Sequence, residues 1–291
     1  MNRSLLAALT TAVIVAGAPS PAVAGPWTKD LGQVYVKLNE GFFFSDSFIN
    51  AEGVVTPGAE YLGVTTSLYF EVGLWKGLQL QGLLPYTVGT NESDRGGDED
   101  KTRRARKAGG ADLLLGLQYS PPIDLGALRL ATRLEFKVPL YDVGEAATGI
   151  AELDNLFPAL GDGQLDITLW LVVGGSLPGP FYAWGEVGYR FRTEAFVGDG
   201  PVDDRSFVDS VAWLGQAGWS FYKRMILMVN FIGVMAVKDD RFTKSYITVG
   251  PGLYLPVWRG LALEANVDPI VHARNSAPGF SFGFGISYTN I

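Results

Sequence analysis

The sequence predicts an all-β protein, a transmembrane antiparallel β-barrel of about 12 strands with short turns at one end and long loops at the other. Three observations favour this class: long segments in which apolar and polar residues alternate, connections that alternate between short and long, and aromatic residues that gather at the segment ends. A barrel that crosses a bilayer has an apolar outer face and a polar inner face, so its strands alternate with a period of two.

Alternation is clearest in segments 164–177 and 181–193, which flank the sequence Pro178-Gly179-Pro180. In both, every second residue is apolar, and polar or charged residues recur between them. Each segment is about twice as long as the usual strand of five or six residues. A long strand with one apolar and one charged face fits a membrane barrel better than a soluble β-sandwich.

Twelve segments of this type can be drawn along the chain. They are 32–44, 61–74, 78–88, 111–119, 127–141, 164–177, 181–193, 207–221, 225–237, 243–256, 261–272 and 280–288. The connections after the second, fourth, sixth, eighth and tenth segments are short, and the others are long. Outer-membrane barrels have short periplasmic turns and long outer loops, so this order predicts both termini on the periplasmic side.

Aromatic residues mark the short-turn end of these segments. They are Trp75, Tyr119, Phe181, Tyr182, Phe221, Tyr222, Trp258 and Tyr288. The opposite segment ends also carry aromatic residues, among them Phe43, Phe44 and Tyr61. Aromatic residues are common in all strands, but their clustering at the segment ends is typical of the girdle that sits among lipid headgroups. The segment 280–288 also resembles the C-terminal strand that the outer-membrane barrel assembly machinery recognises, although Thr289-Asn290-Ile291 follow it where most such proteins end on the aromatic residue.

The first 24 residues have the pattern of a cleavable signal peptide. Arg3 precedes an apolar run at 5–18, and the small residues Ala22-Val23-Ala24 supply a cleavage site. We therefore expect residues 1–24 to be the signal peptide, residues 25–291 to form the barrel, and the protein to reside in the outer membrane of a Gram-negative bacterium. Outer-membrane lipid and lipopolysaccharide are its expected surroundings.

Composition narrows the chemistry. The chain has no Cys, which removes disulfides and thiolate metal sites. Its formal net charge of -7 makes it a poor nucleic-acid binder. It has no Gly-rich phosphate motif and no cluster of metal-ligand residues, so no cofactor is expected. Outside the signal peptide, no run of 18 uncharged apolar residues predicts a transmembrane helix.

The polar faces of the predicted strands should line the lumen, because Arg or Lys facing lipid at the membrane midplane costs about 2–4 kcal/mol. The residues predicted to line the lumen are Lys37, Asp112, Arg129, Arg133, Glu135, Lys137, Asp166, Glu186, Arg190, Arg192, Glu264 and Asp268. Two interpretations stay open: a lumen filled by salt-bridged side chains, and a charge-lined channel that selects a solute. Two neighbouring segments are less polar inside, and such a wall would suit a hydrophobic or amphipathic solute; their inward residues are Ala212, Leu214, Gln216, Met228, Asn230 and Val234.

Two long connections have distinctive compositions. Residues 91–107 are acidic and then basic, as in a solvated outer loop; a second interpretation has the basic residues contact lipopolysaccharide phosphates. Residues 142–163 are longer and partly apolar, so they could form a short helix, fold inward as a constriction or pack over the mouth of the barrel.

An enzyme is not expected. Some outer-membrane barrels hydrolyse lipids with a Ser–His arrangement, and this chain has a single His, His272, close in sequence to Ser276. A serine nucleophile needs a His within hydrogen-bond reach and a third group that orients the ring. The sequence from His272 to Ser276 matches neither the outer-membrane phospholipase nor the lipid A deacylase barrels.

Residues 25–38 have the form W-T-x-x-x-G-x-x-Y-x-x-L, and 42–48 form a Phe-rich, acidic segment. With Gly161-Asp162, Asp166 and the segment 188–192, these motifs resemble the family of outer-membrane proteins known as meta-pathway phenol degradation transporters. The resemblance implies a barrel concerned with uptake of hydrophobic or aromatic compounds. Fatty-acid transporter barrels instead begin with a hatch; here the first strand starts almost directly after Trp27, so we expect any plug to come from the outer loops.

The leading hypothesis is thus a passive channel or transporter for small solutes, with hydrophobic or aromatic compounds as one class. A non-conducting structural or surface barrel is the alternative. An outer-membrane lipid hydrolase is a distant third.

Overall fold

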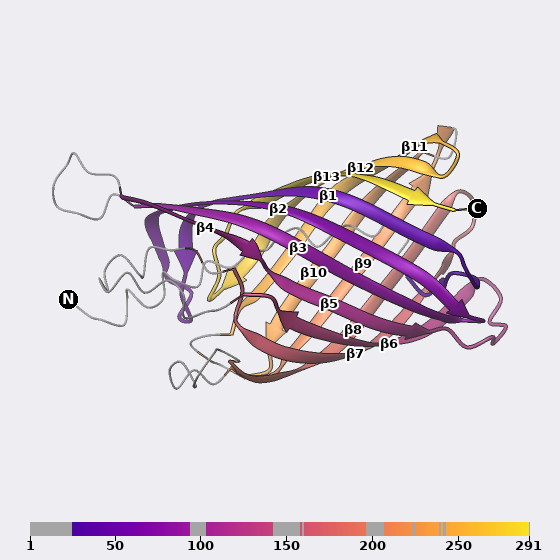
Figure 1. Ribbon diagram of the computed structural model, residues 1–291, viewed down its shortest axis with the longest axis horizontal. Helices are drawn as coiled ribbons and strands as arrows, with labels where there is room; N and C mark the ends of the chain where they lie inside the picture. Colours follow the sequence, from indigo (N-terminus) through magenta and orange to yellow (C-terminus); the bar gives the residue numbers. More distant parts are fainter. Residues whose placement is uncertain are drawn as a thin grey trace.

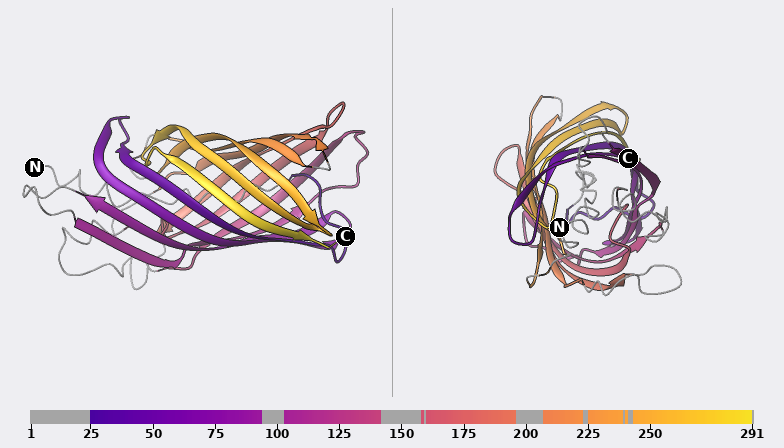
Figure 2. Two further views of the ribbon diagram at one scale, coloured as in Figure 1. Left: turned by 90° about the horizontal axis from the view of Figure 1, so that it is seen from above. Right: turned by 90° about the vertical axis from the view of Figure 1, so that its left-hand side faces the viewer.

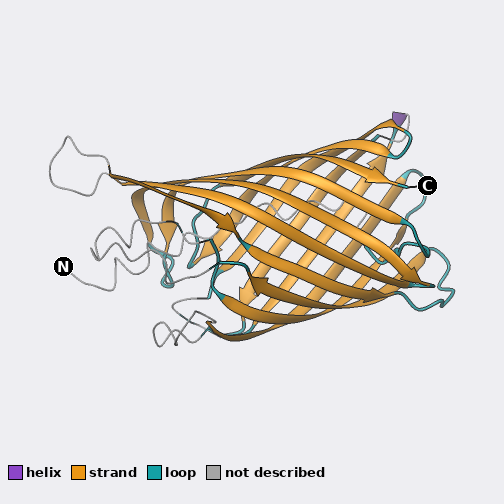
Figure 3. Ribbon diagram, in the orientation of Figure 1, coloured by secondary structure: helices purple, strands orange, loops and turns teal. Residues whose placement is uncertain are grey.

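The computed structural model describes residues 25–93, 103–141, 158, 160–195, 207–222, 225–238, 240 and 243–290. The predicted signal peptide lies outside the described residues. The described chain is almost entirely strand (Figure 3). The strands are β1 (Val34–Ile49), β2 (Val55–Trp75), β3 (Leu78–Ser93), β4 (Arg103–Gly110), β5 (Asp112–Tyr119), β6 (Leu128–Pro139), β7 (Gln164–Ser176), β8 (Phe181–Ala195), β9 (Ser210–Ser220), β10 (Ile226–Ala236), β11 (Ser245–Trp258), β12 (Leu261–Arg274) and β13 (Phe280–Thr289).

These strands form one closed antiparallel barrel (Figures 1 and 2). Apart from β4 and β5, strands that follow one another in sequence pair with each other, and β1 pairs with β13 to close the ring. Both β4 and β5 pair with β3, one above the other, so the 13 strands occupy 12 positions around the barrel. Ala111 separates β4 from β5, and its N–H donates to the carbonyl of Pro85 at 3.1 Å. The predicted barrel of about 12 antiparallel strands is confirmed.

All twelve predicted segments lie within or across observed strands, but two connections were wrong in part. The predicted loop 89–110 contains the end of β3 and all of β4, and the predicted loop 45–60 contains the end of β1 and the start of β2. The reason is physical: the end of β1 with the start of β2, and the end of β3 with β4, project beyond the rim made by the other strands (Figure 1). Beyond the membrane no lipid requires alternation, while the backbone ladder continues to satisfy the N–H and C=O groups.

The barrel has the reverse polarity of a soluble protein, with apolar side chains on its outer face and polar side chains on its inner face. In β13, Phe280, Phe282 and Phe284 are exposed, whereas Ser281 and Ser287 are buried. The same holds in β7, where Leu169 is exposed and Asp166 is fully buried. An apolar outer face and a polar inner face are the arrangement that a bilayer requires.

The short-turn end carries the predicted aromatic girdle. Trp75, Tyr222 and Trp258 are among the most exposed large side chains of the described residues. The tight turns there depend on glycine: Gly77 and Gly260 have φ values of 73° and 85°, and a Cβ at either would lie within about 2.2 Å of a backbone carbonyl oxygen. Among the described residues, no helix is both long and apolar enough to cross a membrane.

Candidate functional site

The centre of the lumen holds a charged network built on three neighbouring strands. Arg133 of β6 makes two hydrogen bonds to Glu186 of β8, from Nη1 to Oε2 and from Nη2 to Oε1, each 2.8 Å long. Its Nε lies 3.5 Å from the carboxylate of Glu135. Such a bidentate guanidinium–carboxylate pair is among the stronger hydrogen-bonded contacts, and it satisfies both groups inside the barrel.

Trp170 of β7 lies between the two partners. The guanidinium of Arg133 stacks over its ring, 4.8 Å from the centroid, and its Nε1–H donates to Glu135 at 3.2 Å. The ring lies flat against β8 because Gly188 stands opposite Trp170 in the ladder, where a Cβ would lie 2.6 Å from the ring. A glycine on β8 thus gives Arg133 the room to reach across β7.

A second network closes the loop end of the lumen. Asp162 accepts from Arg192 at 2.7 Å and from Lys244 at 2.6 Å, which joins the connection before β7 to the connection before β11. Asp166 lies 2.9 Å from Lys137 and 3.5 Å from Arg192. Burial favours the neutral form of Asp162, but Lys244, Arg192 and Lys137 outweigh it and hold the pKa of this carboxyl well below its usual range.

The residues just before β7 fold inward at this end. Leu160 is buried and lines the lumen, and the N–H of Gly163 donates to the hydroxyl of Tyr141 at 2.7 Å. Of the alternatives considered for the connection 142–163, inward folding fits its described C-terminal residues. Residues 142–157, where we considered a short helix, lie outside the described residues.

The segment before β1 crosses the lumen at the short-turn end. The carbonyl of Gly25 accepts from Gln118 of β5 at 2.8 Å, and the N–H of Lys29 donates to Gln79 of β3 at 2.9 Å. The ammonium group of Lys29 lies 3.3 Å from Glu71 of β2. On the opposite side, a Cβ at Gly25 would lie 3.3 Å from the ring of Trp184 on β8.

The expectation that any plug would come only from the outer loops was therefore wrong. Residues 25–29 are too few for a hatch domain, but five extended residues reach about 17 Å, which is enough to enter the lumen. Their anchors are two backbone groups and one ion pair, and backbone contacts leave no pattern in a sequence.

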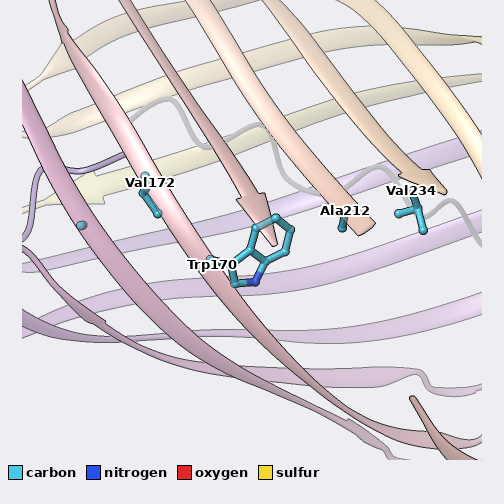
Figure 4. Packing of buried hydrophobic residues seen from close by; sticks show 5 residues of the cluster. Trp170, Val172, Ala212 and Val234 are labelled. Atoms are coloured by element: carbon cyan, nitrogen blue, oxygen red, sulfur yellow. The ribbon is translucent and has the colours of Figure 1, made fainter. Parts of the chain in front are cut away.

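Between these two ends lies a cavity of about 270 Å³ with two unlike walls. One wall is the charged network of β5 to β8, including Arg133, Glu135 and Lys137. The other wall is apolar, and Figure 4 shows part of it: Trp170 of β7, Ala212 of β9 and Val234 of β10 pack in one buried cluster. Leu214 and Tyr246 pack against this cluster and also line the cavity. The predicted less polar region around Ala212, Leu214 and Val234 is thus part of a defined apolar wall.

Most of the predicted lumen residues lie inside the barrel in three groups. The cavity is lined by Asp112, Arg133, Glu135, Lys137, Glu186 and Arg190. Asp166 and Arg192 belong to the network at the loop end. Lys37, Glu264 and Asp268 are buried on β1 and β12, where Lys37 donates to Glu264 at 2.6 Å.

Arg129 does not join any of these groups. It is exposed at the turn end of β6 and donates to the carbonyls of Gly126 and Leu128 at 3.1 and 2.9 Å. Conversely, the predicted set did not include Glu71, Gln79 or Trp170. For Glu71 a signal exists, because it is in phase with Ser67 and Thr65, the polar positions of the same strand.

The described residues offer no sign of the Ser–His arrangement. His272 is exposed, whereas the side chain of Ser276 is buried, and no hydrogen bond joins the two. Within the described part of the chain, no group of three or more His, Cys, Asp or Glu side chains is placed to hold a metal ion. The basic residues of the predicted loop 91–107 lie in a strand and not in a loop, because β4 begins at Arg103. One of them, Arg104, forms an ion pair with Glu92 of β3 at 3.0 Å.

No family model matches the chain, and no curated protein matches it in sequence. Solved structures do share its fold. An outer membrane channel from Pseudomonas putida F1 superposes with a TM-score of 0.62, covering 93% of this chain and 99% of that chain at 12% identity. The translocator domain of the autotransporter NalP from Neisseria meningitidis superposes with a TM-score of 0.55, covering 94% of this chain and 91% of that chain at 12% identity. The NanC porin superposes with a TM-score of 0.51, covering 87% of this chain and 98% of that chain at 8% identity. At these identities the likeness shows the fold, which is that of outer-membrane barrels.

Proposed function

We propose that this protein is an outer-membrane channel through which small hydrophobic or aromatic solutes pass. The observation that carries the proposal is the mid-lumen cavity, whose apolar wall of Trp170, Ala212 and Val234 lies inside an otherwise polar barrel. Lumen residues that only filled the barrel would be expected to pair with one another, as those of the charged wall do. An apolar wall beside a cavity gains contacts when an apolar solute enters.

The comparisons support the channel class, since one of the similar folds is described as an outer membrane channel and another as a porin. The resemblance of residues 25–38 and 188–192 to the phenol degradation transporters supports hydrophobic or aromatic compounds as the solute class. The surrounding partners in this proposal are outer-membrane lipid and lipopolysaccharide, with the barrel assembly machinery for insertion.

A solute that crosses the whole lumen must pass two barriers. On the loop side, Asp162 bridges Arg192 and Lys244 above the cavity. On the turn side, Lys29 and Gly25 hold the segment before β1 against β2, β3 and β5. Among the described residues, the turn-side barrier has the fewer ion pairs, with a single one from Lys29 to Glu71, so its displacement is the less costly opening.

The test is uptake across an intact outer membrane, because hydrophobic probes cross simple lipid vesicles unaided. Gram-negative cells that produce the protein should take up N-phenyl-1-naphthylamine, a hydrophobic fluorophore, faster than cells that produce a variant with a filled cavity. Val234→Trp fills the cavity from β10. Val229→Trp is the matched control, since Val229 is an exposed residue of the same strand.

The expected result is fast uptake with the unaltered protein and with Val229→Trp, and slow uptake with Val234→Trp. Folded barrels resist unfolding by dodecyl sulfate at room temperature, so a gel shift on heating checks that each variant is folded. If a folded, unaltered barrel gives no uptake above that of cells without it, the protein is the non-conducting structural barrel instead.

A further inference from the structure

The charged side chains that line the cavity differ in whether they have an ion-pair or hydrogen-bond partner inside the lumen. They are Asp112, Arg133, Glu135, Lys137, Glu186 and Arg190. Five of these six have an ion-pair or hydrogen-bond partner within the lumen. Within the described part of the chain, the guanidinium of Arg190 has neither.

The register explains why Arg190 has no carboxylate. In its two ladders it stands opposite Thr168 of β7 and Ser210 of β9, and neither carries a charge. The carboxylates nearby are already engaged: Glu186 holds Arg133 through both oxygens, and Asp166 lies between Lys137 and Arg192. A guanidinium facing a cavity without an anion leaves five donors in a planar fork that suits a carboxylate.

A second polar group beside Arg190 is also unsatisfied. Ser210 is fully buried, and its hydroxyl has no hydrogen-bond partner. It occupies the inward phase of β9 together with Ala212 and stands directly opposite Arg190 in the β8–β9 ladder. Buried hydroxyl groups without a partner are rare. Ser210 does not itself line the cavity, so Arg190 is the group of this pair that a ligand in the cavity can reach.

The apolar wall lies around the same cavity. Trp170, Leu214, Val234 and Tyr246 line it along with Arg190. A ligand that satisfies both features has one anionic group and an apolar body. The other two cations of the cavity, Arg133 and Lys137, are already paired, so a second anionic group would find no partner.

We propose that the cavity binds small hydrophobic monocarboxylates, with the carboxylate on the guanidinium of Arg190 and the ring or alkyl chain against Trp170, Leu214 and Val234. This inference rests on the proposed channel function for its physiological role and names the solute class of that channel. A cavity of about 270 Å³ admits a single aromatic ring or a short alkyl chain.

The experiment measures binding by calorimetry, with the full barrel in phosphatidylcholine nanodiscs and empty nanodiscs as the blank. The probes are octanoate, its neutral analogue octanamide and the cation octyltrimethylammonium. The unaltered protein should bind octanoate at least about tenfold more tightly than octanamide, because hydrogen bonds to charged groups are roughly twice as strong as neutral ones. It should bind the cation most weakly of the three.

Arg190→Gln should lose about tenfold in octanoate affinity and leave octanamide binding unchanged, while Arg190→Lys should lose less because it keeps the charge without the fork. Arg129→Gln is the matched control: it removes one positive charge outside the cavity and should not alter octanoate binding. The heat-dependent gel shift confirms that each variant is folded.

Equal affinities of the unaltered protein for octanoate and octanamide would overturn the proposal. So would an unchanged octanoate affinity in folded Arg190→Gln, or an equal loss in Arg129→Gln, which would assign the effect to net charge.

The proposed channel and the proposed monocarboxylate site can fail separately. Normal fluorophore uptake without carboxylate preference overturns only the monocarboxylate site, whereas octanoate binding that depends on Arg190 without uptake supports the site and overturns the channel.

Discussion

The two walls of the cavity are made of the same kind of alternating strand but satisfy their inward side chains differently. On β6 to β8, Arg133 is neutralised by Glu186, and Lys137 by Asp166. On β9 and β10, Ala212 and Val234 pack among other apolar side chains. Most charged groups of the first wall are therefore paired with other groups of the protein. The apolar side chains of the second wall can instead exchange contacts with one another for contacts with a solute. Stability and solute handling should depend on different walls.

The largest expected effect is on the charged wall. Glu186→Leu removes the bidentate partner of Arg133. Among the described residues, the buried guanidinium then keeps one ion-pair contact, the longer one to Glu135, and its stacking on Trp170. Breaking a buried ion pair in this way costs about 3 kcal/mol or more. Denaturant unfolding from lipid vesicles, compared with the unaltered barrel, measures the loss.

The double variant Arg133→Met with Glu186→Leu is the control, because replacing both partners by apolar residues recovers most of such a loss. A single variant as stable as the unaltered protein would show that the pair contributes nothing to the fold. The two walls would then not differ as we argue.

The next effect is at the loop end of the charged wall and depends on pH. The pKa of Asp162 is held well below its usual range, because Lys244, Arg192 and Lys137 outweigh the effect of burial. A carboxyl group whose pKa is lower in the folded state adds stability that is complete above its unfolded pKa of roughly 4 and is lost as the pH falls through the folded value. Asp162→Asn should therefore cost about 2 kcal/mol at pH 7, as expected for lost hydrogen bonds to charged groups.

The difference between the unaltered protein and Asp162→Asn should shrink at pH 2 to 3. Unfolding curves of both proteins at pH 7 and in acid give the comparison directly. A difference that stays constant over this range would contradict the role of the ionised carboxylate at this position.

Sequence alternation predicted the wall strands well because lipid imposes it. With few exceptions, such as Thr132, the outward positions between β5 and β13 are apolar, so the inward set, including Arg133, Asp166 and Glu186, followed from phase alone. The same logic fails where lipid is absent. For β4, which lies beyond the rim, no apolar face was required, and the strand looked like a loop.

The partners inside the lumen could not be predicted for a different reason. Arg133 has carboxylates within reach on its own strand and two strands away, and the choice of Glu186 depends on Gly188 and on the orientation of Trp170. The lack of a partner for Arg190 likewise depends on the β7–β8–β9 register. Side-chain pairing of this kind is set by three-dimensional packing.

A smaller effect is expected on the apolar wall. Val234→Thr keeps the shape of the side chain and adds a hydroxyl that faces the cavity, so the barrel should lose only about 1 kcal/mol. Uptake of the hydrophobic fluorophore should nonetheless fall, because the wall becomes more polar. Stability from denaturant unfolding and uptake from cells are measured on the same variant. A loss of stability as large as that of Glu186→Leu would remove the distinction between the walls.

The smallest change in the free energy of unfolding is expected for a substitution at Arg129. This position tests how far the charged network extends toward the turn end of β6. Arg129 and Arg133 share one phase of β6 and lie four residues, or about 13 Å, apart along the strand. Alternation alone treats them as equivalent, yet Arg129 is exposed and bonded only to backbone carbonyls of its turn. Arg129→Gln should change the free energy of unfolding by less than about 0.5 kcal/mol, as for most surface substitutions. A loss comparable to that of Glu186→Leu would mean that the network extends to the turn end and that inward phase, rather than depth in the lumen, decides which charges stabilise the barrel.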